Sequence, residues 1–174
     1  MAASVPPGAD KLLYLPYLMG ERTPVLDANA RGAFFGLSAR HTRAHMARAV
    51  LEGVCYSLYN CLDVLAEMGV DAHDMLLCGG GGKSPFWRGM LTDVYGFDVK
   101  RTVSDEGASL GAAILGGCAA GVYASVADGC RQAVRVRDVT RPDAAKHKLY
   151  MRQYAVYATL YPALKDTFSQ LQQL

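Results

Sequence analysis

Four consecutive glycines separate an apolar segment from a helix start, and they constrain the fold more than any other feature of the sequence. Residues 74–78 (DMLLC) are typical of a short strand, and residues 79–82 are all glycine. Ser84 and Pro85 follow, which favour the N-cap and the first turn of a helix. Glycine lets a backbone approach a ligand closely, and helix N-termini attract anions. The segment therefore predicts a nucleotide or phosphate site, with a tight structural turn as the alternative.

Two familiar phosphate-binding motifs do not fit this turn. A G-x-x-x-x-G-K-[ST] loop ending at Gly82-Lys83-Ser84 would need glycine where Leu77 stands. A G-x-G-x-x-G fingerprint counted from Gly79 would need glycine in place of Ser84. The spacing therefore excludes both motifs and leaves the kind of nucleotide open.

The segments around the turn predict an α/β domain. Residues 11–18 (KLLYLPYL) and 32–37 (GAFFGL) are short apolar runs bounded by loop residues, and we expect two antiparallel strands there. Helices and strands then alternate, with no strand placed between the last two helices. We predict one domain over residues 1–174, whose further elements are helix 41–68, strand 74–78, a helix from Pro85, strand 97–102, and helices 107–121, 125–133 and 143–170.

Periodicity assigns a buried face to three of these helices. In helix 41–68, which Gly69 should end, the apolar face comprises Met46, Val50, Val54, Leu58, Cys61, Leu62 and Leu65. The helix after the glycine turn should bury Trp87, Met90, Leu91 and Val94. The final helix should dock through an aromatic face made of Tyr150, Tyr154, Tyr157 and Tyr161.

Composition and charge exclude several classes of function. The chain has 174 residues, a net charge of +2 and 51% hydrophobic residues, which gives no basic field and no nucleic-acid partner. Polar residues interrupt the long apolar stretches, and residues 1–10 lack a secretory signal, so we expect no membrane segment and a cytoplasmic location. The five cysteines include no C-x-x-C pair, which predicts free, mostly buried thiols.

Several polar residues outside the turn could carry chemistry, but a structural role is favoured for each. Glu52 lies four residues after Arg48, so an ion pair is expected rather than acid–base chemistry. His41 and His45 have the spacing of metal ligands but no third ligand nearby, and we expect no metal site. Asp93 is expected to be structural.

Two further charged residues and one loop lie at turns or helix ends. Lys83 could reach a phosphate but is expected to be solvated. Glu106 is expected to stabilise the start of the helix that follows it, through the helix dipole. The loop 20–24 (GERTP) could border an active cleft. Ion pairs within that region are the favoured alternative, and they would involve Glu21, Arg22, Asp27 and Arg31.

Two segments resemble a signature of the FGGY family of carbohydrate kinases. Residues 32–37 (GAFFGL) and 45–52 (HMARAVLE) match the second signature of that family residue for residue. The resemblance extends through residues 14–37, 79–96 and 106–117, and it covers about residues 12–164. It is strongest to the xylulose kinase branch of the family.

The resemblance implies an actin-like ATPase (ribonuclease-H-like) α/β fold of two lobes, with ATP in the cleft between them. The chain resembles most of the C-terminal lobe, a mixed sheet flanked by helices that would lack its first strands. The family's catalytic base and most of its sugar contacts belong to the N-terminal lobe. We therefore assign no catalytic residue and no metal ligand to this chain, and the missing N-terminal lobe is its implied partner.

For the glycine turn, the resemblance implies contact with the adenosine and phosphates of ATP through Gly79, Gly80 and Gly81. Ser84 would face the nucleotide, cap the helix, or do both. Mg²⁺ would be held through the phosphates, water and carboxylates of the other lobe.

The implied activity is ATP-dependent phosphorylation of the sugar D-xylulose to D-xylulose 5-phosphate. Kinases of glycerol, gluconate or ribulose, and a non-catalytic nucleotide-binding module, remain alternatives. A homodimer is left open.

Overall fold

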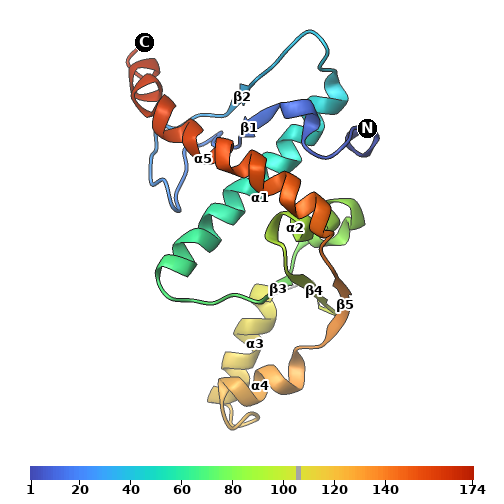
Figure 1. Ribbon diagram of the computed structural model, residues 1–174. Coiled ribbons are helices and arrows are strands. Elements are labelled where there is room, and N and C mark those ends of the chain that lie inside the picture. Colours follow the sequence, from blue (N-terminus) through green and yellow to red (C-terminus); the bar gives the residue numbers. More distant parts are fainter. Residues whose placement is uncertain (105–106) are drawn as a thin grey trace. The chain divides into compact units, whose positions relative to one another are not determined.

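The computed structural model describes residues 1–104 and 107–174, which form two compact units. Unit 1 contains residues 1–72, 93–96 and 142–174, and unit 2 contains residues 73–92 and 97–141. Figure 1 shows the chain entering unit 2 after α1 and returning to unit 1 before α5. The single domain expected over residues 1–174 stays a prediction.

Unit 1 combines a short hairpin with two long helices. Strands β1 (Leu13–Leu15) and β2 (Ala33–Phe35) pair antiparallel, with Leu13 opposite Phe35, which confirms the predicted pairing. Helix α1 spans Arg43–Glu67 and helix α5 spans Ala144–Leu171. The left-handed φ of Gly69 (81°) follows the end of α1, as the glycine there predicted.

The buried face of α1 differs from the one that periodicity predicted. Leu58 and Leu65 are exposed, whereas the buried residues of the helix are Arg48, Ala49, Glu52, Gly53, Cys55 and Tyr56. A Cβ atom on Gly53 would lie 2.1 Å from the carbonyl oxygen of Tyr14, so β1 approaches α1 at a distance that only glycine allows. The prediction holds for Met46 and Val50, which are partly buried against the core of unit 1. It is wrong for Leu58 and Leu65, because the helix buries small residues and an ion pair in their place.

The aromatic face of α5 packs on α1, as its spacing predicted. Tyr150 and Tyr157 are buried, and the ring centroid of Tyr56 lies 5.3 Å from that of Tyr157. Tyr154 packs edge-on against Tyr59 at 4.7 Å between centroids. These contacts bring segments together that are far apart in the sequence (Figure 1).

Unit 2 is a three-stranded mixed sheet with helices. Strand β3 (Asp74–Leu77) is parallel to β4 (Asp98–Thr102), and β5 (Val136–Thr140) is antiparallel to β4. The helices are α2 (Pro85–Tyr95), whose last turn belongs to unit 1, α3 (Gly107–Ala119) and α4 (Val126–Ala133). No strand was predicted between α4 and α5, so β5 corrects the predicted order of elements.

The expectation of mostly buried thiols is wrong. Only Cys55 is buried among the five free cysteines, while Cys78 and Cys130 are exposed.

Helix α1 contains an 18-residue window with a mean hydropathy of 1.2, long and apolar enough to span a membrane by composition. Core helices pass the same test, and α1 packs against α5 and β1.

Candidate functional site: the glycine turn

The glycine turn lies between β3 and α2, as predicted. Gly79 has φ 83° and ψ −175°, a backbone conformation that favours glycine, and Gly80–Lys83 then form one 3₁₀ turn. Helix α2 begins at Pro85, and the Ser84 hydroxyl accepts a hydrogen bond from the Trp87 amide at 3.4 Å. Ser84 therefore caps the helix in this structure.

The four glycines divide into an open pair and a packed pair. Cβ atoms added to Gly79 or Gly80 would meet nothing within 4 Å. A Cβ atom on Gly81 would lie 2.4 Å from the Trp87 ring, and one on Gly82 would lie 3.2 Å from Leu77 Cγ. Packing inside unit 2 therefore explains the glycine at position 81, whereas it does not explain the one at position 80.

Arg88 fixes the packed end of the turn. Its guanidinium donates to the carbonyl oxygen of Gly82 at 2.7 Å and to the Thr140 hydroxyl at 2.9 Å. The carboxylate of Asp138 lies 3.6 Å from the same guanidinium, whose side chain is largely buried. Thr140 and Asp138 both lie on β5, a strand that was not predicted, so Arg88 was not predicted as part of the site.

The predicted Arg48–Glu52 ion pair is confirmed, and it is buried in unit 1. Arg48 Nε lies 2.7 Å from Glu52 Oε1, which also accepts hydrogen bonds from the Gly8 amide at 2.8 Å and the Tyr150 hydroxyl at 3.2 Å. Arg48 donates in turn to the carbonyl oxygen of Val5 at 2.6 Å. Burial raises the pKa of Glu52, and the donors from Gly8 and Arg48 oppose that rise.

The two histidines of the predicted i, i+4 pair are engaged in hydrogen bonds. Backbone amides of Ser38 and Thr42 donate to Nδ1 of His41 and His45, so each ring carries its proton on Nε2. Those protons are donated to Asp10, to its carbonyl oxygen at 3.2 Å and its carboxylate at 3.1 Å. Among the described residues, no group of three or more His, Cys, Asp or Glu could hold a metal ion.

The loop at 20–24 is held by hydrogen bonds, which corrects the expectation of ion pairs. Glu21 and Asp27 exchange backbone hydrogen bonds at 2.9 Å, and the Tyr161 hydroxyl donates to the Asp27 carboxylate at 2.9 Å. Arg31 donates to backbone carbonyls and to Gln172, and no ion pair joins these loop residues within the part of the chain that the structure describes.

The remaining candidates are placed as follows. Asp93 is structural as predicted, because its carboxylate accepts the Asp143 amide at 2.8 Å near the start of α5. Lys83 is exposed. Glu106 lies outside the described residues, so its expected effect on α3 stays a prediction.

Comparison with known proteins decides the family. Residues 1–120 match the family described as "FGGY family of carbohydrate kinases, C-terminal domain". The chain belongs to the FGGY family of carbohydrate kinases. It is 39% identical over 171 residues to a xylulose kinase of Staphylococcus epidermidis, an alignment that covers 98% of this chain and 34% of that protein.

Solved structures give the same family without separating its substrates. A ligand-bound xylulose kinase from Lactobacillus acidophilus matches with a TM-score of 0.91 and 29% identity, over 98% of this chain and 34% of that one. A gluconate kinase from the same organism matches with a TM-score of 0.90, the same identity and the same coverage. The predicted fold class, the mixed α/β lobe of an actin-like ATPase, is confirmed. The chain spans about a third of the length of these relatives.

Proposed function

We propose that the chain is the nucleotide-side part of an ATP-dependent sugar kinase that phosphorylates D-xylulose to D-xylulose 5-phosphate. The observation that carries the proposal is the open half of the glycine turn, in a chain that belongs to a carbohydrate kinase family. Phosphoryl transfer depends mostly on positioning and charge stabilisation. A turn that holds the nucleotide therefore suits a lobe to which we assign no catalytic base.

The geometry of the turn fits a nucleotide in two respects. Gly79 and Gly80 present backbone with open space where side chains would be, so a ribose or phosphate can approach closely. Arg88 holds the packed end of the turn in place through the Gly82 carbonyl oxygen, so little ordering is needed on binding. We propose contacts to ATP from Gly79 and Gly80, with Gly81 adding backbone and Ser84 adding its hydroxyl beyond its role as a cap.

Mg²⁺ fits this scheme as a partner of the nucleotide. The described residues offer no cluster of ligands for it, so the phosphates, water and carboxylates of the N-terminal lobe would hold it. Bound there, Mg²⁺ would neutralise charge that develops on the transferred phosphoryl group.

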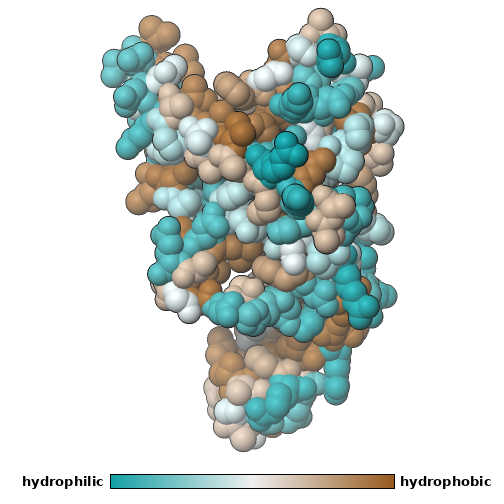
Figure 2. All heavy atoms as spheres, viewed as in Figure 1, coloured by the Kyte–Doolittle hydropathy of each residue, from teal (hydrophilic) through white to brown (hydrophobic). Residues whose placement is uncertain are grey.

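The remaining two thirds of the kinase would supply the catalytic base and the sugar contacts. Unit 1 exposes Phe35 at the end of β2 and Leu37 just after it, and Figure 2 shows hydrophobic side chains gathered around β1 and β2. Exposed apolar groups of this kind commonly mark surfaces that other protein covers. Their coverage by the N-terminal lobe, and a cytoplasmic location, are parts of the same proposal.

Replacing Gly80 tests the nucleotide turn directly. Gly80→Val adds a branched side chain where the fold has room, so the helical circular dichroism should be unchanged while ADP binding, measured by calorimetry, is lost. Gly116→Val is the matched control, since its Cβ also meets nothing within 4 Å and it lies in the second half of α3. Unchanged ADP affinity in Gly80→Val would refute the assignment of the turn.

The sugar is tested in the longer polypeptide that contains this chain. ADP release with Mg-ATP should be fastest with D-xylulose in a panel that includes L-ribulose, glycerol and gluconate. Preference for gluconate, which the gluconate kinase likeness makes the main rival, would keep the kinase and change its substrate. No ADP release with any of these sugars would favour the non-catalytic nucleotide-binding module.

A further inference from the structure

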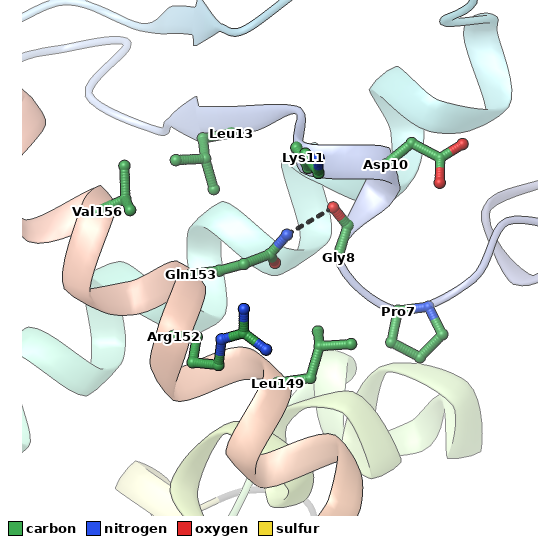
Figure 3. A pocket seen from close by; sticks show the side chains of 9 residues that line it. All are labelled: Pro7, Gly8, Asp10, Lys11, Leu13, Leu149, Arg152, Gln153 and Val156. Carbon is green, nitrogen blue, oxygen red and sulfur yellow. Dashed lines mark hydrogen bonds between the residues drawn. The ribbon is translucent and has the colours of Figure 1, made fainter.

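A pocket of unit 1 combines apolar walls with two cationic side chains. It has a volume of about 460 Å³, within the range of small-molecule sites. Figure 3 shows it between the N-terminal segment and α5. Its lining residues are Pro7, Gly8, Asp10, Lys11, Leu13, Leu149, Arg152, Gln153 and Val156.

The N-terminal wall of the pocket is a left-handed turn that its neighbours hold in place. The φ angles of residues 8–11 are 90°, 45°, 51° and 73°. The Gly8 amide donates to buried Glu52, and its carbonyl oxygen accepts from Gln153 at 2.8 Å, the dashed line in Figure 3. Asp10 accepts from both His41 and His45. The wall is therefore preformed, which lowers the entropy cost of binding.

The charges of the pocket are unevenly satisfied. The Asp10 carboxylate keeps its negative charge, but it accepts the Nε2 proton of His45 and points away from the other labelled side chains in Figure 3. The side chains of Lys11 and Arg152 make no hydrogen bond or ion pair within residues 1–104 and 107–174. Two exposed cations without partners therefore line the pocket. The other lining residues are polar at Gly8, Asp10 and Gln153 and apolar at Pro7, Leu13, Leu149 and Val156.

Lys11 occupies a backbone position that suits glycine better. A φ of 73° is costly for a residue with a Cβ atom, and such strain is concentrated at functional positions. Ala9 and Asp10 share the left-handed conformation, so the strain belongs to the whole turn that forms this wall of the pocket.

We propose that this pocket binds a small organic phosphate monoester with an apolar body. A phosphate monoester carries close to two negative charges at neutral pH, which matches the two unpaired cations better than a carboxylate does. The guanidinium of Arg152 can bind the phosphate oxygens in bidentate fashion while Lys11 adds a point charge. The apolar body lies against Leu13, Leu149 and Val156. The site is independent of nucleotide binding at the glycine turn.

Phenyl phosphate is the probe, titrated into the isotope-labelled 174-residue chain and followed by its amide NMR signals. The expected result is saturable shifts at Gly8, Leu149 and Gln153. Inorganic phosphate, which lacks the apolar body, and phenylacetate, which has a single charge, should each bind at least about tenfold more weakly. Equal binding of either comparison anion, or shifts confined to the glycine turn, would overturn the proposal.

Two substitutions assign the charges, and one substitution serves as their control. Lys11→Gly removes the ammonium and relieves the left-handed strain, so binding should weaken about tenfold while the unfolding temperature is kept or raised. Arg152→Gln should weaken binding to a similar extent. Lys148→Gln removes an exposed cation of the same helix that does not line the pocket, and its affinity should equal that of the wild type. Wild-type affinity in Lys11→Gly would contradict the proposal, because that variant keeps the fold.

Discussion

Among single residues, Arg48 contributes most visibly to the closure of unit 1. It lies on α1, and its guanidinium reaches Val5 of the N-terminal segment, Glu52 of its own helix and Tyr150 of α5. Its side chain is almost fully buried, and one oxygen of Glu52, Oε2, makes no hydrogen bond. A buried carboxylate in this position depends strongly on its cationic partner.

Arg48→Met should therefore destabilise the chain by about 3–5 kcal/mol, because it leaves a buried charge without a counterion. Burial already raises the pKa of Glu52, and loss of Arg48 removes one of the groups that oppose the rise. Glu52 will take up a proton more readily in the native state of the variant. The loss in the free energy of unfolding should therefore shrink as pH falls through the raised pKa of Glu52. Urea unfolding at several pH values measures both effects.

The double variant Arg48→Met/Glu52→Leu provides the control for this prediction. It removes the stranded charge as well as its partner, so part of the lost stability should return. A single variant that loses less than about 1 kcal/mol would show that the pair contributes little.

Arg88 connects separate segments at the glycine turn, as Arg48 does in unit 1. Arg88→Gln loses the donors to Gly82 and Thr140, and we expect a loss of about 2–3 kcal/mol in the free energy of unfolding together with weaker ADP binding. Thr140→Val removes only the hydroxyl acceptor and should cost about 1 kcal/mol with ADP affinity kept. If Arg88→Gln binds ADP as tightly as Thr140→Val, the hydrogen bond from Arg88 to the Gly82 carbonyl oxygen is not needed for ADP binding.

Among the elements, those with a local signal were predictable from the sequence. Gly69, the Ser84-Pro85 pair and the tyrosine spacing of α5 mark a helix end, a helix start and a docking face, and all three are present in the structure. Strand β5 (VRDVT) was missed because it is short, mostly exposed and rich in charge, so its pairing with β4 comes from tertiary context.

The candidate site was predictable where its residues are close together in the sequence, and not where they come from distant segments. The glycines and Ser84 are consecutive in the sequence, whereas the partners of Arg88 lie on β5. Periodicity found only part of the packed face of α1: Met46 and Val50 contact the core, whereas Gly53 is buried by the close approach of Tyr14. Contacts between distant segments carry no local pattern.

Asp143 caps the start of α5. The Asp143 carboxylate accepts the amides of Ala145 at 2.9 Å and Lys146 at 3.1 Å. The amide of Lys146 is the main cause that lowers the pKa of Asp143 below its ordinary value. A lowered pKa means that the cap stabilises the fold above the pKa of the unfolded chain and loses this effect as pH falls through the folded value.

Asp143→Ala should accordingly lower the unfolding temperature at neutral pH, because two helix amides lose their acceptor. Asp143→Asn keeps an oxygen acceptor without charge. Its unfolding temperature should be close to that of the wild type at neutral pH and should change less with pH in the acid range. Thermal unfolding followed by circular dichroism at pH 7 and pH 3 distinguishes the three proteins. Equal unfolding temperatures for Asp143→Ala and the wild type at pH 7 would contradict the role of the cap.

For the molecule as a whole, the proposed division of labour in the kinase makes a clear prediction. The 174-residue chain by itself should bind ADP weakly, because half of the expected cleft belongs to other residues, and it should release no ADP in response to sugar. Calorimetry and a coupled ADP assay measure these two properties. Sugar-dependent turnover by this chain would show that a catalytic base lies within it.

The long-range hydrogen bonds have a consequence for the order in which the chain is made. Arg88 and Thr140 are 52 residues apart, and Glu52 and Tyr150 are 98 residues apart. A ribosome delivers the earlier partner first, so neither bond can form until the later one has left the exit tunnel. The segments synthesised last therefore set the moment in translation at which each unit closes.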